Sequence, residues 1–212
     1  MCYKLRVPKV VNAAARRSDV ADAVFRIIAT DGLARVSLRE VAAEASLVVG
    51  SVRHYFKDSA ELLEHAFATA DDRLEERLSA RLPAVHEAAD SGDAEALTEA
   101  SLLLLAEFLP LDGNSAAECS ARTEFRLASR GNAGLQAEAE RGYRAAAAVV
   151  GQLIQVFRPD GELEELVVEA ERLMSLLDGL SLHALVHSQW LDAAMCRNVL
   201  TAHLKSLAPS PH

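Results

Sequence analysis

The chain has 212 residues, of which half are hydrophobic and a quarter are charged, while only 10 are Gly and 6 are Pro. This composition excludes a disordered, collagen-like or low-complexity chain, and the length suits one large domain or a small domain joined to a larger one. Apolar runs are shorter than the roughly 18 residues of a membrane span, and the first residues lack the apolar core of a signal peptide. We therefore expect a cytoplasmic protein without a membrane partner.

Charge is distributed unevenly along the chain, whose formal net charge is −9. Residues 1–66 contain ten Lys and Arg against eight Asp and Glu, whereas the remaining residues contain twelve against 23. Residues 1–17 hold five positive charges and no acidic residue, as expected of a basic arm beside a polyanion. The sequence thus predicts a basic head on an acidic body.

Three cysteines, Cys2, Cys119 and Cys196, lie far apart and without CxxC spacing. This pattern argues against a disulfide framework and against a zinc cluster. We expect reduced thiols, no metal and no cofactor.

Apolar residues recur every three or four positions, which predicts an all-α fold of about nine helices. A first helix is expected over residues 18–30, with Gly32 just past its end. Ser37, followed three residues later by Glu40, is typical of the N-cap of a second, short helix. A third short helix is expected over residues 49–55.

A long fourth helix follows, because Asp58 and Glu61 repeat the capping pattern. We expect Pro83 to end it near residue 82, since proline breaks the interior of a helix. Turn signals separate five further predicted helices, over residues 94–109, 115–129, 135–157, 163–188 and 192–207.

Two short helices with a tight connection, after a longer packing helix, have the shape of a helix-turn-helix. Here they span VSLREVAAEASLVVGSVRHYF, residues 36–56. The second short helix must enter a major groove about 12 Å wide, so its outward residues should be small or able to hydrogen-bond. The outward positions are Val49, Gly50, Ser51, Arg53 and His54, and the inward positions are Leu47, Val52 and Phe56.

These residues resemble the TetR-type transcriptional regulators over about fifty positions, from VADAVFRIIATDGL (20–33) through the helix-turn-helix to KDSAELLEHAF (57–67). The resemblance implies a three-helix head with its basic arm in residues 1–66 and a helical effector-binding and dimerisation domain in residues 67–212. Residues 171–188, ERLMSLLDGLSLHALVHS, also resemble the penultimate helix of such proteins.

The resemblance implies a repressor that binds a palindromic DNA operator as a homodimer and is released by a small-molecule effector. It carries DNA contacts over to Ser37, Arg39, Val49, Gly50, Ser51, Arg53, His54, Tyr55 and Lys57. Arg53 is the expected reader of guanine, because a guanidinium can pair with O6 and N7 at once.

Four residues depart from the family pattern. Ser46 replaces the usual Gly of the turn, and Val48 replaces the usual Ser or Thr cap, so that the third helix loses its side-chain N-cap. Ser59 stands where a phosphate-binding Lys is usual, and Arg53 where a Tyr is common. Lys57 is a candidate substitute for the missing Lys.

In the body, wide apolar faces near the C-terminus predict a dimer interface, a four-helix bundle across a two-fold axis. Its expected residues are Leu173, Leu176, Leu177, Leu180, Leu200 and Leu204. The alternative is that these faces are buried within the monomer.

Aromatic or polar side chains within apolar helices are candidates for an effector pocket. They are Phe108, Cys119, Arg122, Phe125, Arg126, Tyr143, Phe157, His183, His187 and Trp190. Arg122 and Arg126 are spaced to meet an anionic ligand, but ion pairs with Glu118 and Glu124 are the favoured alternative. His183 and His187 have a spacing that can hold a metal, although a core or interface role is favoured.

Two other classes of function are alternatives. An enzyme is disfavoured, because HExxH, GxSxG, a phosphate loop and GxGxxG are all missing from the sequence. A helical adaptor without specific DNA binding is the second alternative, encouraged by Val48 and Ser59.

Overall fold

The computed structural model describes residues 13–207, which form nine α-helices, one short 3-10 helix and no strand. This confirms the all-α prediction. The helices are α1 (Ala13–Asp31), α2 (Leu38–Glu44), α3 (Val49–Tyr55), α4 (Ser59–Ser91), α5 (Ala94–Ala106), α6 (Gly113–Ser129), α7 (Ala133–Phe157), α8 (Leu163–Val186) and α9 (Ala193–Leu207), with the 3-10 turn η1 at Leu33–Arg35. Of these helices, none combines the length and the hydropathy needed to cross a bilayer.

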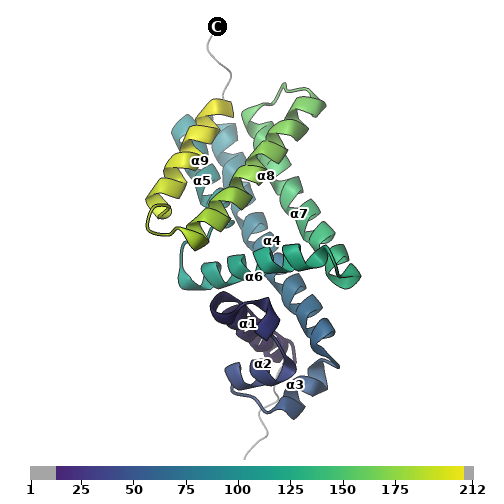
Figure 1. Ribbon diagram of the computed structural model, residues 1–212. Helices are drawn as coiled ribbons and strands as arrows, with labels where there is room; N and C mark the ends of the chain where they lie inside the picture. Colours follow the sequence, from purple (N-terminus) through teal and green to yellow (C-terminus); the bar gives the residue numbers. More distant parts are fainter. Residues whose placement is uncertain (1–12, 208–212) are drawn as a thin grey trace, which may run out of the picture.

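Helices α1 to α3 form a small head at one end of the molecule (Figure 1). The long helix α4 runs from this head into the body, where α5 and α7 pack against it, while α8 packs on α7 and α9 packs on α5. Helix α6 lies crosswise between the two parts and contacts α1 on the head side and α8 on the body side. The head therefore touches the body mainly through α4 and α6.

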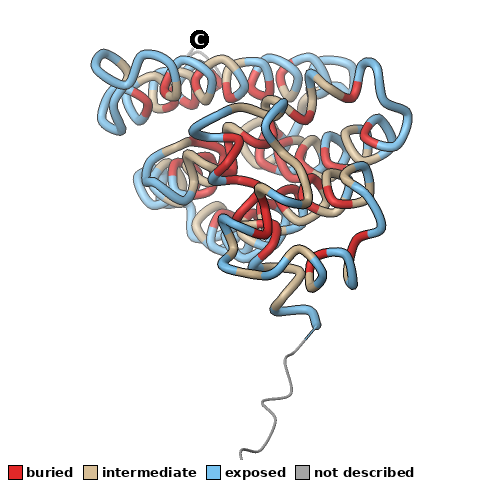
Figure 2. Tube along the Cα trace, turned by 60° about the horizontal axis from the view of Figure 1, so that its bottom comes forward, coloured by how far each residue is buried: buried red, intermediate tan, exposed pale blue. Residues whose placement is uncertain are grey.

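The buried residues form two clusters, visible as the inner strips of the helices (Figure 2). The head cluster contains α1, α2, α3 and the start of α4, but it also includes Phe125 of α6 and Leu135 of α7. The rings of Phe67 and Phe125 stack with their centroids 5.1 Å apart. The core of the head thus extends beyond residue 66, and the division at that residue stays a prediction.

Both predicted N-caps are present. The Ser37 hydroxyl accepts a hydrogen bond from the Glu40 N–H at 3.2 Å, and the Asp58 carboxylate accepts one from the Glu61 N–H at 2.9 Å. Each cap satisfies an N–H that has no partner inside its helix. The starts of α2 and α4 are therefore determined locally.

The expectation that Pro83 ends the fourth helix is wrong, since α4 continues to Ser91. Proline removes the hydrogen bond to the carbonyl four residues earlier, that of Ser79. Both Ser79 and Pro83 are exposed, so water can satisfy that carbonyl. Val85, just beyond the proline, is fully buried in the body core, and this burial offsets the local cost of the proline.

Asp71 of α4 is buried where this helix packs on α7, and only 5% of it is exposed. A Cβ built on Gly142 of α7 would lie 2.1 Å from the Asp71 carboxylate, so only glycine permits this approach. Burial raises the pKa of Asp71 to about 6, against the opposing charges of Arg126 and Arg122. The charged form of Asp71 therefore destabilises the fold.

We predict that Asp71→Asn raises the free energy of unfolding at neutral pH. The pKa of Asp71 is about 6 in the folded chain against 3.8 as its ordinary value, so the folded state binds the proton more tightly. The penalty is absent below the lower pKa, grows as the pH rises from the lower to the higher one, and is complete above the higher one, at about 3 kcal/mol. Urea unfolding between pH 4 and 8 measures it.

Asp90→Asn, an exposed change on the same helix, is the matched control. If the difference between Asp71→Asn and the unmodified chain does not increase with pH, Asp71 is not the destabilising charge.

Candidate functional site

Helix α3 buries one side and exposes the other. Val52 and Phe56, the latter just past its end, are fully buried against the head core. Gly50, Arg53 and His54 are exposed. The prediction thus holds for Val52 and Phe56 inward and for Gly50, Arg53 and His54 outward, whereas Val49, predicted to face outward, is half-buried against the head core. Two groups able to hydrogen-bond face solvent.

The remaining DNA-contact candidates surround this face. Arg39 and Lys57 are exposed, and Ser37 is the N-cap of α2. Val49, Ser51 and Tyr55 are half-buried on α3 itself. Their role in binding DNA stays a prediction, but their side chains share one end of the molecule.

Arg17 fastens the end of α3 to α1. Its guanidinium donates a hydrogen bond to the Tyr55 carbonyl at 3.0 Å and lies 4.4 Å from the centre of the Phe56 ring. The ring of His65 on α4 also packs against the Phe56 ring, with the two centroids 5.2 Å apart. Burial, assisted by the charge of Arg17, lowers the pKa of His65. These contacts fix the C-terminal end of α3 on α1 and α4.

The sequence predicts Arg16 only as part of a basic arm, but this residue also neighbours the exposed face of α3. Arg16 lines a surface hollow together with Gly50, Ser51 and His54 of α3. Three other charges of that arm, Lys4, Arg6 and Lys9, lie outside the described residues. Arg16 thus adds a positive charge at the edge of α3. Its position beside α3 depends on how α1 packs, which the sequence alone does not give.

The turn before α3 shows both departures noted in the sequence. Ser46 has a φ of 55°, in the left-handed region where glycine is favoured. Val48 is the N-cap of α3, its side chain makes no cap hydrogen bond, and 72% of it is exposed. The first turn of α3 is therefore held by its packing and not by a cap.

We predict that Val48→Thr stabilises α3, because a hydroxyl at the N-cap can accept a hydrogen bond from a free N–H of the first turn. The expected gain in the free energy of unfolding is about 1 kcal/mol. Chemical denaturation measures it, and hydrogen exchange of the α3 amides localises it.

Val48→Ala provides the control, since it also removes the exposed valine but supplies no acceptor. An equal gain from both variants would show that loss of the exposed side chain, and not a cap, is responsible.

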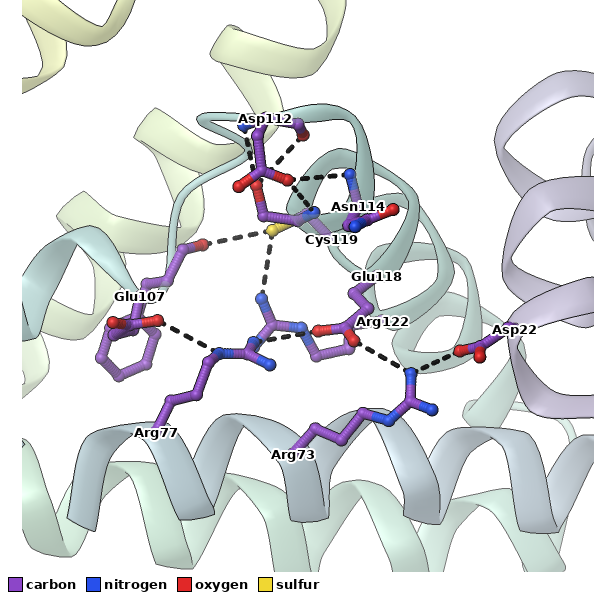
Figure 3. Close-up of polar contacts among 11 residues, drawn as sticks. Asp22, Arg73, Arg77, Glu107, Asp112, Asn114, Glu118, Cys119 and Arg122 are labelled. Atoms are coloured by element: carbon purple, nitrogen blue, oxygen red, sulfur yellow. Dashed lines mark hydrogen bonds and ion pairs between the residues drawn. The ribbon is translucent and has the colours of Figure 1, made fainter. Parts of the chain in front are cut away.

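At the junction of head and body, two arginines of α4 hold a buried carboxylate of α6 (Figure 3). Glu118, 9% exposed, accepts from Arg73 at 3.2 Å and from Arg77 at 2.9 Å. Arg73 also donates to Asp22 of α1 at 2.6 Å. Burial alone lowers the pKa of Arg73, but its bonds to Asp22 and Glu118 outweigh burial and raise it. One charged network therefore joins α1, α4 and α6.

A second link joins the turn after α1 to α6. The Leu33 N–H donates a hydrogen bond of 2.7 Å to the Glu124 carboxylate. Glu118 and Glu124 are thus engaged by the head and by α4. The expected ion pairs of these two residues with Arg122 and Arg126 are absent among the described contacts, because tertiary neighbours lie nearer.

The body contains a cavity of about 240 Å³ between α6, α8 and the segment after α5. Its inner wall includes Phe108, Cys119, Arg122 and Leu177, each at most 6% exposed. The outer rim includes Arg126, Leu127, Asp178 and Leu182. Arg126 donates to Asp178 across this rim at 2.8 Å.

Four of the ten predicted pocket residues line this cavity: Phe108, Cys119, Arg122 and Arg126. The other six lie outside the lining of this cavity. Phe125 lies in the head core and Phe157 packs on the body core. The Tyr143 hydroxyl donates to Glu171.

His183, His187 and Trp190 are exposed at the end of α8 and beyond it, outside the cavity lining. The rings of His183 and His187 lie 6.0 Å apart. Within residues 13–207, three or more His, Cys, Asp or Glu side chains do not come together as a metal site would require.

The predicted dimer interface is wrong for five of its six leucines. Leu173, Leu177, Leu180, Leu200 and Leu204 are at most 6% exposed in the monomer, because α8 and α9 pack on α5 and α7. Leu176 is half-buried against the same core. The alternative of burial within the monomer therefore holds for these side chains.

Other residues of α8 form an exposed face. Val168, Ser175, Gly179, Leu182 and Val186 follow one another at spacings of three, four or seven, which places them on one side of the helix. Val168, Leu182 and Val186 are 58%, 46% and 63% exposed. Sequence reasoning missed this stripe, because buried leucines and exposed apolar residues have the same helical period.

Two family models match this chain, one over the head and one over the body. The family model of the bacterial regulatory proteins of the tetR family matches residues 20–66. The model of the C-terminal part of BetI-type transcriptional repressors matches residues 97–209. A helix-turn-helix head on a larger helical body is the architecture of a DNA-binding transcriptional regulator, and the chain belongs to the TetR family of these regulators.

Individual relatives and solved structures are consistent with this family and fold. The HTH-type transcriptional regulator BetI of Cronobacter sakazakii is 29% identical over 211 residues, covering 97% of this chain and 98% of the relative. The structure of a transcriptional regulator from Rhodococcus sp. Rha1 has the same fold, with a TM-score of 0.75, 23% identity and coverage of 90% and 95%. The multidrug binding protein EbrR, crystallised with ethidium, is 26% identical with a TM-score of 0.60 and coverage of 92% and 99%.

Proposed function

We propose that this regulator is a repressor that binds a palindromic operator as a homodimer and is released when a small molecule enters the body cavity. The observation that carries the proposal is the exposed side of α3, where Arg53 and His54 point away from the core. A helix of this size fits the major groove, and a guanidinium on it can read guanine. The proposed partner, duplex DNA, suits the cytoplasmic location expected from the sequence.

Positive residues around α3 support phosphate binding. Arg16, Arg39 and Lys57 lie near it, on the part of the chain whose net charge is positive. Phosphate contacts position a protein on the duplex without reading its sequence. We assign base reading to Arg53, with His54 as a second reader, and phosphate binding to the residues around them.

Arg53→Ala is expected to weaken operator binding by about 1 to 3 kcal/mol and to relax the preference at one base pair. Lys57→Ala should weaken binding on all sequences alike and reduce the slope of log affinity against log salt by about one. Operators selected from random DNA, followed by fluorescence anisotropy at several salt concentrations, measure both effects.

Arg144→Ala, an exposed change on α7, is the matched control. Equal weakening of Arg53→Ala on every DNA sequence would contradict a base-reading role. Failure to select any DNA sequence would favour a helical adaptor instead.

Reading a palindrome requires two heads about 34 to 36 Å apart, one turn of the duplex. We propose that the exposed α8 stripe, Val168 to Val186, forms the two-fold contact between copies. The neighbouring α9 adds Met195, Val199 and Ala202 at the same spacing, exposed or half-buried. An apolar, two-helix face of this kind suits a self-complementary four-helix contact.

Gly179→Lys is expected to convert the dimer to a monomer and to abolish tight operator binding. A Cβ at Gly179 meets nothing within 4 Å in the monomer, so the larger side chain is tolerated there but blocks the close approach of a second copy. Sedimentation equilibrium measures the oligomeric state.

The chain offers a matched control in Gly151→Lys. Gly151 is also helical, half-buried and free of neighbours within 4 Å of a Cβ, but it lies on α7. A Gly179→Lys variant that stays dimeric would show that the contact between copies lies elsewhere.

The effector is proposed to act through α6. This helix lines the cavity with Cys119 and Arg122. Its Glu118 is held by Arg73 of α4, which also binds Asp22 of α1. A ligand that moves α6 therefore moves α4 and the head together, and so changes the distance between the two heads. Coupling of this kind typically amounts to about 1 to 3 kcal/mol. EbrR, whose structure holds ethidium, supports a small-molecule effector for a protein of this fold.

A further inference from the structure

Arg122 is an unusual component of the cavity wall. The residue is only 5% exposed, yet its side chain carries a permanent charge. One terminal nitrogen donates to the Cys119 sulfur at 3.1 Å, and the Nε is buried without any hydrogen-bond partner. A thiol sulfur is a weak acceptor, so the donor groups of this guanidinium are poorly satisfied.

The acidic residues that sequence suggested as its partners are engaged elsewhere. Glu118 is shared by Arg73 and Arg77, and Glu124 accepts from the Leu33 N–H. Asp71 is close enough for the charge of Arg122 to lower its pKa, but burial raises that pKa further, to about 6. Among the described residues, Arg122 forms no ion pair with a carboxylate.

The cavity as a whole carries one uncompensated positive charge. Its charged lining residues are Arg122, Arg126 and Asp178. Asp178 is paired with Arg126 at the rim, at 2.8 Å. The remaining charge is that of Arg122, at the buried end, where a charge is costly unless a partner of opposite sign binds it.

The rest of the lining is mostly apolar, with Thr123 and Ser181 as its uncharged polar members, and the cavity is small. Phe108 and Leu177 stand beside Arg122 on the inner wall, and Leu127 and Leu182, 64% and 46% exposed, stand at the rim. The volume of about 240 Å³ exceeds the 150 Å³ of an engineered cavity that binds benzene. It therefore suits a compact molecule with an apolar body somewhat larger than benzene.

We propose that this cavity takes an amphipathic carboxylate, whose anionic group binds the Arg122 guanidinium and whose apolar body lies between the α6 and α8 leucines. The ligand supplies the acceptors that Arg122 lacks, and charge-assisted bonds to a guanidinium are strong and directional. This inference rests on the proposed role of the cavity as the effector site. It assigns the opposite charge from that of the ethidium bound to EbrR.

Calorimetric titration of the full chain with 4-phenylbutyrate, 4-phenylbutanamide and 4-phenylbutylamine tests the charge directly. The three compounds share one apolar body and are negative, neutral and positive at neutral pH. The acid is expected to bind about ten- to a hundredfold more tightly than the amide, and the amine more weakly still. Equal or tighter binding of the amide or the amine overturns the proposal, as does the failure of all three to bind.

Arg122→Met keeps an unbranched side chain of similar length and removes the charge. It should abolish the preference for the acid while retaining binding of the amide. Arg144→Met, at an exposed position on α7, should keep the full preference. A preference that survives in Arg122→Met contradicts the proposal.

The NMR signal of the Arg122 Nε–H in the unsubstituted chain gives a readout that does not depend on how the variant folds. It should shift on addition of the acid and not of the amide. The same shift with both compounds, or with neither, counts against a carboxylate at Arg122.

Operator affinity, measured separately with each compound, distinguishes this inference from the proposed function. If the acid binds through Arg122 but leaves operator affinity unchanged, the anion site stands and the effector role fails. If the amide releases the operator as well as the acid does, the effector role stands and the anion site is overturned.

Discussion

The placement of the head on the body depends on the burial of Glu118 between two arginines of α4 (Figure 3). A carboxylate with 9% of its surface exposed is tolerated only if charged partners replace its lost hydration. Arg73 meets this need and at the same time binds Asp22 of α1. Removing one arginine would leave Glu118 with a single ion-pair partner, and removing both would leave its buried charge unpaired. The two ion pairs thus favour one mutual arrangement of α1, α4 and α6.

Because of this constraint, α6 connects the core of the head to the cavity of the body. Phe125 joins the head core by stacking on Phe67, while Cys119 and Arg122 line the cavity in the body. Because a helix is stiff over seventeen residues, a shift on the cavity side cannot be absorbed within it. The buried network passes such a shift to α4, which carries the head.

The two surfaces proposed to meet partners are built differently. The α3 face is polar and positive at its exposed positions, and its uncapped first turn relies on Val52 and Phe56 for support. The α8 stripe is apolar and small, with a glycine near its middle that allows close approach of another helix. The positive charge of the α3 face thus suits it to duplex DNA. The close approach that Gly179 allows suits the α8 stripe to a second copy of the chain.

The sequence alone determined the helices, the caps at Ser37 and Asp58, and the inward and outward sides of α3, because these depend on neighbours within one or two turns. Only the tertiary structure decided that α4 passes Pro83, since the burial of Val85 outweighs a local helix-breaking preference. It also decided which leucines of α8 face the core, and which carboxylates pair with which arginines. Those choices depend on side chains brought together from α1, α4, α6 and α8, whose distances no local pattern of residues records.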